Sequence, residues 1–490
     1  LDLGVDFRPV DRIFQIGSPK GVARFLQRAG RSGHQPGAVS RIHFIPTHAL
    51  ELVEAAALRE AIAEEVVEER LPHVRSFDVL LQYMTTLAVS DGFYSDELYK
   101  EISSCFCFDS VSQEEWQSCL NFLTTGGSLS AYDDYHKVVV DEDGRHYVDS
   151  RRIARRHRFS IGTIVSDTMI RVKLKRGGVL GHVEEYFISR LKPGDVFWFA
   201  GLHLELIQLR EMTATVQKAQ SKKGVVSSWA GSRMPLSAQM GQMLRKKLNQ
   251  AATSGDGHPE LELLAPMLEL QKEMSIIPKE NEFLIEYLRD EEGHHLFFYP
   301  FEGRFVHEGM AALLAWRISL FCPISFSIAM NDYGFELLSD EAPPLDEMLD
   351  AELFNTENLR EDISQSLNSV EMARRRFRDI AAIAGLVFQG YPGQQIKERH
   401  LQSSSALIFD VFSDFDPDNL LLKQAYDEAL HFQLEESRMR EALDRIAQQK
   451  LNIIELERPG PLCFPILVDR LNREHLSSEQ LDQRIARMVQ

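Results

Sequence analysis

Residues 25 to 34 read FLQRAGRSGH, in which two arginines and a histidine stand at three-residue spacing around two glycines. The three candidate cations are Arg28, Arg31 and His34. Guanidinium forks bind phosphate well, and glycine lets a backbone come close to a ligand. The residue types and their spacing therefore predict a phosphate-binding turn.

The segments on either side of this turn have α/β character. VDRIFQI, residues 10–16, alternates like a buried strand, and SPKG predicts a turn after it. VARFLQRA has helical spacing, and SRIHFIP is typical of a second strand. Residues 49–71 are rich in Ala, Glu and Leu and predict a helix that leads away from this unit. We therefore expect a domain boundary near residue 70.

Residues 75–150 predict three short helices followed by a β-hairpin. The helical segments are SFDVLLQYMTTLAV, YSDELYKEISSC and SQEEWQSCLNFLTTGG, and Ser112 with Glu115 gives the third a capping-box pattern. YHKVVVDEDGRHYV predicts two strands around a DEDG turn. This order is typical of a winged helix over residues 71–155, which serves either a binding function or a purely structural one as a spacer.

The rest of the chain divides into a β-rich and a mixed region. Residues 156–250 contain short strand-like runs at regular spacing and predict a small β-barrel or sandwich. Residues 251–490 predict a hairpin at FLIEYLRDEEGHHLFFYPF, a helix at EGMAALLAWRISL, and long helical segments over 357–387 and from Asn419 to Leu451. The predicted fold class is a multidomain α+β protein.

Charge is distributed unevenly along the chain. The net charge of −19 is unfavourable for a nucleic-acid partner. However, residues 151–178 carry nine Lys or Arg against Asp167 alone, and residues 332–362 carry eleven acids against Arg360 alone. The basic run is either a nucleic-acid surface or an ordinary exposed charged face, and the acidic stretch predicts a solvated or docking surface.

Composition limits the class of protein. A chain of 490 residues with 44% hydrophobic residues is long enough for several domains. It has no apolar run of about 18 residues, and its first residues, LDLGVDF, form neither a basic leader nor a cleavage site. The five cysteines include no CxxC pair, and no HExxH occurs. We therefore expect no membrane insertion, no metal site and a cytoplasmic location.

Several motifs resemble those of one helicase family. LDLGVDF and QIGSPKGVARFLQRAGRSGHQPG resemble motifs V and VI of superfamily 2 helicases, most closely those of the large helicase-related (Lhr) family. The similarity continues through GHVEEYFISRLKPGDVFWFAG, SSWAGSRMPLS, ARRRFRDIAAIAGLVFQGYPG and FPILVDRLNREHLSSEQLDQRIARM, and covers essentially the whole chain. It is most similar to the ligase-associated DNA-damage-response DExH branch. The resemblance implies that residues 1–70 end a second RecA-like lobe and that residues 251–490 form a DEAD/H-associated domain.

The resemblance also implies roles for the phosphate-binding turn. Arg31 would be the arginine finger that reaches the γ-phosphate of ATP, and Gln27 and Arg28 would line the same cleft. A placed guanidinium stabilises the charge on a transferring phosphoryl group. His34 stands where many superfamily 2 members have a second arginine, so it either bonds a phosphate or orients Arg31.

Other parts of a nucleotide site are missing from the sequence. Gly4 and Asp6 of motif V would couple the nucleotide to DNA, but no GxxxxGK[ST] loop and no DExH box occurs. ATP and Mg²⁺ would therefore be held mainly by an N-terminal lobe, and we expect this chain alone to be inactive. Residues 1–48 are too few for a complete lobe, so we expect them to pack against neighbouring segments.

The residues expected to face DNA lie further along the chain. The resemblance implies that Trp229, beside Arg233, stacks on bases of a single strand, whereas the residues alone also allow a core tryptophan. The arginines of the basic run would contact phosphates without reading sequence. They are Arg151, Arg152, Arg155, Arg156 and Arg158.

Two further clusters of charged or titratable residues are expected to have a structural role rather than a binding role. Four arginines at 374, 375, 376 and 378 cannot share one helix face, which favours an ion-pair network over DNA contact. His294, His295 and His307 lack the spacing of metal ligands.

These features predict the C-terminal part of an ATP-dependent DNA helicase or translocase. The resemblance implies 3′ to 5′ movement on single-stranded DNA or a tailed duplex, a role in DNA repair, and a DNA ligase and a nuclease as pathway neighbours. Homo-oligomerisation stays open. The alternative is a non-catalytic scaffold that binds DNA or oligomerises.

Overall fold

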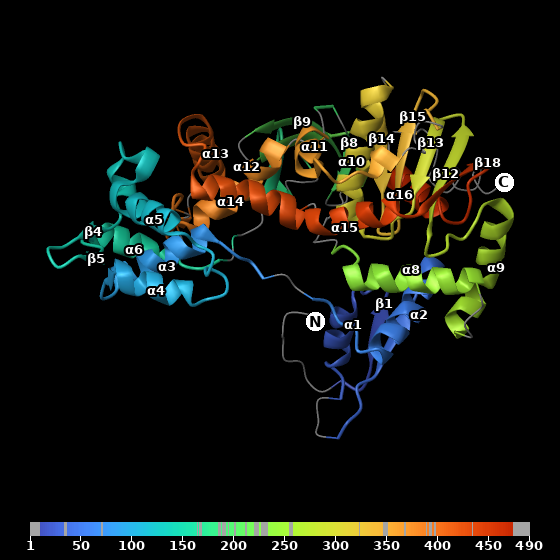
Figure 1. Cartoon of the computed structure of the whole chain (residues 1–490). Helices are drawn as coiled ribbons and strands as arrows, with labels where there is room; N and C mark the ends of the chain where they lie inside the picture. Colours follow the sequence, from blue (N-terminus) through green and yellow to red (C-terminus); the bar gives the residue numbers. More distant parts are fainter. Residues whose placement is uncertain are drawn as a thin grey trace. The chain divides into compact units, whose positions relative to one another are not determined.

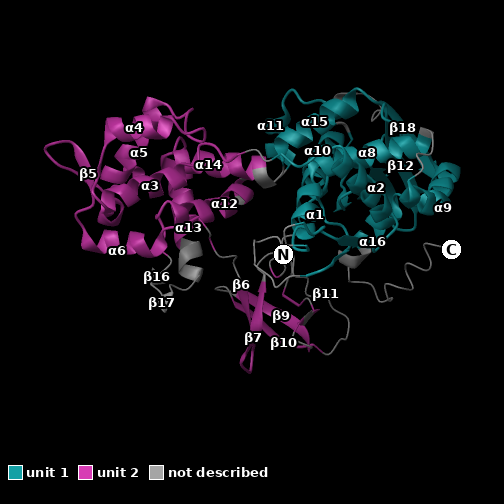
Figure 2. Ribbon diagram, turned by 90° about the horizontal axis from the view of Figure 1, so that it is seen from below, with its two compact units in different colours: residues 1–70, 231–367, 434–490 teal, residues 71–230, 368–433 magenta. Residues whose placement is uncertain are grey.

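The structure of the chain is a computed structural model. It describes residues 10–33, 37–69, 72–163, 165, 169–184, 188, 193–194, 196–199, 202–210, 213–219, 225–226, 234–253, 258–322, 324–345, 351–366, 369–388, 390–391, 394–395, 398–433 and 435–473. The chain forms two compact units (Figure 2). Unit 1 contains residues 1–70, 231–367 and 434–490, and unit 2 contains residues 71–230 and 368–433.

The elements of unit 1 come from three separate segments of the chain (Figure 1). In chain order they are β1 (Ile13–Ile16), α1 (Val22–Ala29), β2 (Ile42–Ile45), α2 (Leu50–Ala63), α8 (Ala238–Thr253), α9 (Pro259–Met274), β12 (Glu282–Asp290), β13 (Gly293–Phe298), α10 (Arg304–Phe321), β14 (Ser327–Met330), β15 (Phe335–Ser339), a 3₁₀ turn at Ala351–Phe354, α11 (Leu359–Ser366), α15 (Glu436–Ala447), β18 (Lys450–Leu456) and α16 (Phe464–Arg473).

The N-terminal α/β segment packs against helices from the second and third segments of unit 1. Strands β1 and β2 pair in parallel, with Ile13 opposite Ile42. On α1 the buried residues are Val22, Phe25 and Ala29, and on α2 they include Val53 and Ala57. They share one core with residues of α8, α9 and α16. The segment therefore obtains its core from its neighbours, as its short length predicts.

A five-stranded sheet lies at the centre of unit 1, in the order β14-β15-β13-β12-β18. The predicted hairpin is confirmed as β12 and β13, which pair from Ile285↔Phe298 to Asp290↔Gly293. Strand β18 pairs with β12 in parallel, with Ile285 opposite Ile453. The predicted helix from Asn419 to Leu451 is wrong at its end, because β18 begins at Lys450.

Both faces of this sheet are covered by helices. Leu284 and Phe297 belong to the core that contains Ile466 of α16. Successive side chains of a strand alternate between faces, so Phe298 points the other way and stacks on Phe335 with ring centroids 4.8 Å apart. The ring of His307 on α10 lies 6.0 Å from Phe335. Burial on both faces explains the nearly continuous apolar pattern of β12 and β13.

Unit 2 contains the winged helix that the sequence predicts. Its elements are α3 (Phe77–Val89), β3 (Phe93–Tyr94), α4 (Ser95–Ser103), α5 (Gln113–Thr125), β4 (Val139–Val140), β5 (Arg145–Tyr147) and α6 (Arg151–Ser160). The capping box is confirmed, because Glu115 N donates to Ser112 Oγ at 3.2 Å and Ser112 N donates to Glu115 Oε2 at 2.9 Å. The helix stops at Gly126, whose φ is +76°.

Helices from residues 368–433 complete the core of the winged helix. They are α12 (Ser369–Ile383), α13 (Glu398–Phe415) and α14 (Leu420–Glu428), and the short strands β16 (Gly390–Tyr391) and β17 (Gln394–Gln395) lie between α12 and α13. Phe377, Phe409 and Phe412 share a buried cluster with Phe77 and Trp116. Residues separated by about 300 positions therefore form one hydrophobic core.

The remaining strands of unit 2 form a sheet with its own core. They are β6 (Met169–Leu174), β7 (Val179–Glu184), β8 (Val196–Phe199), β9 (Leu202–Arg210), β10 (Thr213–Lys218) and β11 (Val225–Val226), in the order β11-β8-β9-β10-β6-β7. Within the described residues no pairing joins β11 to β7, so the predicted β-barrel is not closed there. The mixed α+β class with a winged helix is as predicted, and the four-domain division stays a prediction.

None of the helices that the structure describes combines the length and the apolar character needed to cross a membrane.

Candidate functional site

The predicted phosphate-binding turn lies at the C-terminal end of helix α1. We call residues 28–33 the arginine turn. Arg28 Nη1 donates to Gln15 Oε1 at 2.6 Å, and the Gln15 side chain is itself fixed by a 2.9 Å bond from its Nε2 to Gly17 O. Gln15 is only 9% exposed, so a buried side chain of strand β1 holds Arg28. Arg31 follows three residues later and is half-buried, with its backbone N–H bonded to Arg28 O at 3.0 Å. The two arginines are therefore held on one rigid turn.

Ser32 and Gly33 fix the backbone of this turn. Ser32 is 1% exposed, and its Oγ lies 2.8 Å from Ala29 O and accepts a 2.7 Å bond from Arg41 N. Gly33 has a φ of +66°, and a Cβ there would lie 2.9 Å from the carbonyl carbon and oxygen of Val39. Only glycine fits such a position without displacing backbone. Ser32 lies between Arg31 and Gly33 in the sequence, but it carries no charge, so the pattern of cations does not predict its role.

The structure brings together part of the predicted nucleotide-facing set. Arg28 and Arg31 lie on the same turn, and Gln27 is exposed at the end of α1. Gly4, Asp6 and His34 lie outside the described residues. The same holds for Trp229 and Arg233, the predicted DNA-facing pair of the β-rich region.

The five arginines of the basic run lie on helix α6, which begins at the cap Ser150 and buries none of its residues. They divide into two faces. Arg152 and Arg156 form ion pairs with Asp134, the second at 2.8 Å. The hydrogen bond from Arg156 lowers the pKa of Asp134. Asp134 therefore partly neutralises this face of α6.

Arg151, Arg155 and Arg158 form an exposed arginine face on α6. Their spacing of four and three residues places them on one side of a helix. Arg155 lies over the ring of Phe159 at 6.0 Å, and Phe159 is 48% exposed. Burial, together with nearby Lys137 and Arg158, lowers the pKa of His157 to about 4, so this histidine adds no charge near neutral pH. The exposed arginine face therefore carries the positive charge of α6 toward solvent.

The arginines of α12 form ion pairs, as their distribution predicts. Arg374 bonds to Asp410 at 2.7 Å, and Arg376 bonds to Glu428 at 2.5 Å. Both acids come from other helices of unit 2 rather than from the acidic stretch 332–362. This cluster therefore holds α12 to α13 and α14.

The histidines considered as metal ligands have other partners. His295 is fully buried, and its Nδ1 and Nε2 lie 2.6 Å from Glu336 Oε1 and 2.8 Å from Asp290 Oδ1. His307 Nδ1 donates to Asn331 O at 2.7 Å, and its Nε2 accepts from Glu302 N at 3.0 Å. Over the residues that the structure describes, no group of three or more His, Cys, Asp or Glu could hold a metal ion.

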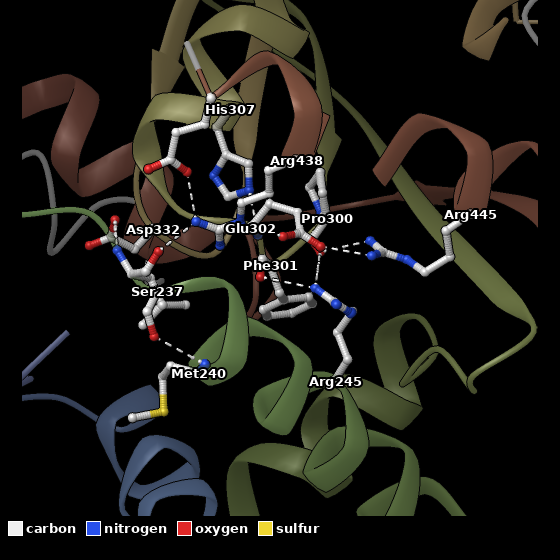
Figure 3. A network of polar contacts seen from close by, with 12 residues as sticks. Ser237, Met240, Arg245, Pro300, Phe301, Glu302, His307, Asp332, Arg438 and Arg445 are labelled. Carbon is white, nitrogen blue, oxygen red and sulfur yellow. Dashed lines mark hydrogen bonds and ion pairs between the residues drawn. The ribbon is translucent and has the colours of Figure 1, made fainter. Parts of the chain in front are cut away.

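Glu302 contacts residues of three helices (Figure 3). Its side chain bonds to arginines of α8 and α15, and its backbone N–H donates to His307 of α10. Its carboxylate accepts hydrogen bonds from Arg245 at 2.5 Å, Arg445 at 2.7 Å and Arg438 at 2.9 Å. Burial opposes ionisation of this group, but the three guanidinium charges outweigh it and lower the pKa of Glu302. The three arginines supply hydrogen-bond partners for the buried carboxylate of Glu302, so the role of this cluster is structural.

Two family models match the chain. The winged helix domain of the large helicase-related protein matches residues 60–226, and the DEAD/H associated model matches residues 277–463. The chain is similar to the C-terminal part of Lhr proteins. The first of these matches includes the winged helix and α6, and the second includes all five strands of the central sheet of unit 1.

Relatives and a solved structure are similar to the chain over nearly its whole length. The ATP-dependent helicase Lhr-Core protein 2 of Thermococcus barophilus is 27% identical over 95% of this chain and 56% of its own length. The Lhr-Core helicase of Methanocaldococcus jannaschii is 25% identical over 96% of this chain and 56% of its own length. The structure of Mycobacterium smegmatis helicase Lhr bound to ssDNA and AMP-PNP matches with a TM-score of 0.70, at 21% identity, over 95% of this chain and 57% of that one. The chain thus has the Lhr fold and spans about half the length of these relatives.

Proposed function

We propose that the full-length protein is an ATP-dependent translocase that moves 3′ to 5′ along single-stranded DNA and unwinds tailed duplexes, and that this chain supplies its C-terminal part. Similarity to Lhr proteins supports the proposal, as do relatives named ATP-dependent helicases. The structural observation that carries it is the arginine turn, in which Gln15 anchors Arg28 and places Arg31 one turn further on.

The residues of the turn fit a nucleotide phosphate. Two guanidinium groups, from Arg28 and Arg31, lie on a backbone fixed by Ser32 and Gly33. Guanidinium charge placed in advance stabilises a transferring phosphoryl group without reorganisation during the reaction. In our proposal Arg31 is the arginine finger, Gln27 and Arg28 line the cleft, and His34, Gly4 and Asp6 take the roles that the family motifs imply.

ATP and Mg²⁺ would be held mainly by another RecA-like lobe of the full-length protein. Bound there, Mg²⁺ would neutralise charge on the β- and γ-phosphates. The contribution of this chain is the pair of cations on the arginine turn, and residues 1–70 would form the end of the second lobe.

For DNA, we propose that the exposed arginine face of α6 contacts backbone phosphates. Its three arginines are exposed and share one side of α6. The ion pairs with Asp134 should reduce the contribution of Arg152 and Arg156. Backbone contacts position a strand without reading its sequence, which suits a translocase. Trp229 would add base stacking and Arg233 a further phosphate contact.

Replacing Arg151, Arg155 and Arg158 together by alanine should flatten the salt dependence of single-stranded DNA binding. Each phosphate contact contributes about 0.7 to the slope of log affinity against log salt, so the slope should fall in magnitude by about 2. Fluorescence anisotropy titrations at four salt concentrations would measure it.

The matched control replaces Arg152 and Arg156 by alanine. Both changes remove charge from the same helix, but these two arginines lie beside Asp134. We expect a smaller change in slope per arginine than in the triple variant. An unchanged slope in the triple variant would remove α6 from the DNA path.

Strand displacement tests the direction of movement. We expect the full-length protein with ATP and Mg²⁺ to unwind a duplex with a 3′ single-stranded tail and to leave the same duplex with a 5′ tail intact. Gel separation of the displaced strand would measure this. DNA binding without displacement of either substrate would favour a scaffold function instead.

We also propose that the protein acts in DNA repair in the cytoplasm, with a DNA ligase and a nuclease as pathway neighbours. The similarity of the tail motifs to the ligase-associated DExH branch supports this assignment. Co-purification of a ligase or a nuclease with the tagged full-length protein would test it.

A further inference from the structure

A carboxylate from outside helix α1 occupies the N-terminus of that helix. Val22 N and Ala23 N donate to the two oxygens of Glu68 at 2.5 and 2.6 Å. The first N–H groups of a helix have no partner within it, and the helix dipole favours an anion there. Burial acts to raise the pKa of Glu68, but the bonds from Ala23 N–H and the Ser237 hydroxyl outweigh it and lower this pKa. Glu68 is therefore an ionised cap of α1.

Gly21 leaves the space that this carboxylate fills. A Cβ at Gly21 would lie 2.6 Å from Glu68 Oε1. The φ of Gly21 is 179°, which any residue adopts, so space rather than conformation requires glycine here. A methyl group at Gly21 would displace the Glu68 carboxylate from the end of α1. It would not remove the negative charge of Glu68.

The residue before Gly21 is held by a second carboxylate. Lys20 Nζ lies 2.9 Å from Asp332 Oδ2. Asp332 Oδ1 also accepts bonds from Arg304 N at 3.1 Å and Leu236 N at 3.3 Å. Lys20 has a φ of +64°, a conformation that is unfavourable for a residue with a side chain and persists only when its surroundings hold it. The entry to α1 is therefore fixed by its neighbours.

Ser237 connects these two attachments to helix α8. Its Oγ donates to Glu68 Oε1 at 2.8 Å and accepts from Met240 N at 3.2 Å (Figure 3), and its backbone N donates to Lys20 O at 2.9 Å. Arg304, bonded to Asp332, begins α10. The N-termini of α1, α8 and α10 thus share one network within unit 1.

We propose that Glu68 and the Lys20–Asp332 ion pair are positioning residues that hold α1 in the orientation in which Arg31 reaches the nucleotide. This inference rests on the proposed function, because it needs Arg31 to act on ATP. It assigns to the C-terminal segments of unit 1 a part in nucleotide hydrolysis, since Asp332 and Ser237 lie far from α1 in sequence.

A small tilt of α1 at its N-terminus displaces the arginines at its C-terminal end. A helix of this length is about 12 Å long, so a tilt of about 5° at its N-terminus moves its far end by about 1 Å. A misplacement of about 1 Å can lower a catalytic rate roughly a hundredfold. Arg28 and Arg31 lie at that far end.

The test uses ATP hydrolysis by the full-length protein with single-stranded DNA. Glu68→Gln removes the charge of the cap, and Gly21→Ala displaces the carboxylate without removing charge. We expect each to lower kcat roughly 10- to 100-fold, with the KM for ATP and the affinity for single-stranded DNA within twofold of the wild type. The neighbouring exposed Glu69, changed to Gln, is the matched control and should leave kcat unchanged.

A double-variant comparison separates positioning from folding. In an Arg31→Ala background, Glu68→Gln should lower kcat no further, because the group it positions is gone. A purely structural role would lower the melting temperature but leave kcat per folded molecule unchanged. The proposal is overturned if both Glu68→Gln and Gly21→Ala keep kcat within twofold, or if Glu68→Gln costs as much without Arg31 as with it. Full activity of Arg31→Ala itself would refute the proposed function instead.

Discussion

Replacing Arg31 by alanine in the full-length protein should lower the rate of DNA-stimulated ATP hydrolysis about a thousandfold, because an arginine finger contributes at least that factor in related nucleotide hydrolases. Arg31 is half-buried on a turn fixed by Ser32 and Gly33, so its backbone is positioned before the nucleotide binds. Steady-state phosphate release would measure the effect. Most of it should appear in kcat, since charge on the phosphoryl group develops in the transition state.

Two variants make this prediction specific. Arg28→Ala should cost less than Arg31→Ala, because Arg28 is held at Gln15 and lines the cleft in our proposal. Arg12→Ala, at an exposed position just before β1, removes the same charge away from the turn and should have no effect. A loss of less than tenfold for Arg31→Ala would contradict its role as a finger.

Replacing His295 by phenylalanine should destabilise unit 1 by about 3 to 5 kcal/mol, because it leaves the buried carboxylate of Glu336 without its hydrogen-bond partner. His295 and Glu336 are both fully buried and lie 2.6 Å apart, and Asp290 bonds the other ring nitrogen. Arg470 pairs with Glu336 at 3.1 Å but cannot replace the bond to Asp290. Calorimetric melting would measure the change.

The same histidine predicts a dependence of stability on pH. Burial opposes its charge, but the hydrogen bonds to Asp290 and Glu336 outweigh burial and raise the pKa of His295 to about 9. A raised pKa in the folded state stabilises the protein fully below the unfolded value of about 6.5, and this contribution is lost as pH rises through about 9. The wild type should therefore lose about 3 kcal/mol over this interval, at 1.36 kcal/mol per pKa unit.

The His295→Phe variant should lack this part of the pH dependence. His294→Gln is the matched control, because His294 bonds the hydroxyl of Tyr287 at 2.6 Å and touches neither carboxylate. It should cost about 1 kcal/mol and keep the wild-type pH profile. Equal pH profiles for the wild type and His295→Phe would show that the histidine is not the titrating group.

Local features of the fold were predictable because their signals lie within a few residues. Ser112 and Glu115 specify the start of α5, and the DEEG turn specifies the hairpin of β12 and β13. Contacts between distant segments have no such signal. Gln424 bonds Asp78 at 2.8 Å across 346 positions, and β18 joins β12 from the far end of the chain. Such contacts explain why each unit is built from segments that are far apart in the sequence.

The candidate site shows the same division. Arg28 and Arg31 were predictable from residue type and spacing, since phosphate chemistry requires cations on a close-approaching backbone. Their supports were not predictable, because Gln15, Glu68 and Asp332 are ordinary polar residues until the fold brings them to α1. On α6 the sequence indicated five equivalent arginines, whereas the structure places Arg152 and Arg156 in ion pairs with Asp134.

In our proposal Arg31 acts on the terminal phosphate of ATP. The decisive experiment is a structure of the full-length protein with a non-hydrolysable ATP analogue and single-stranded DNA. We expect a guanidinium nitrogen of Arg31 at about 2.7 to 2.9 Å from an oxygen of the γ-phosphate. A γ-phosphate with no contact to the arginine turn would contradict it.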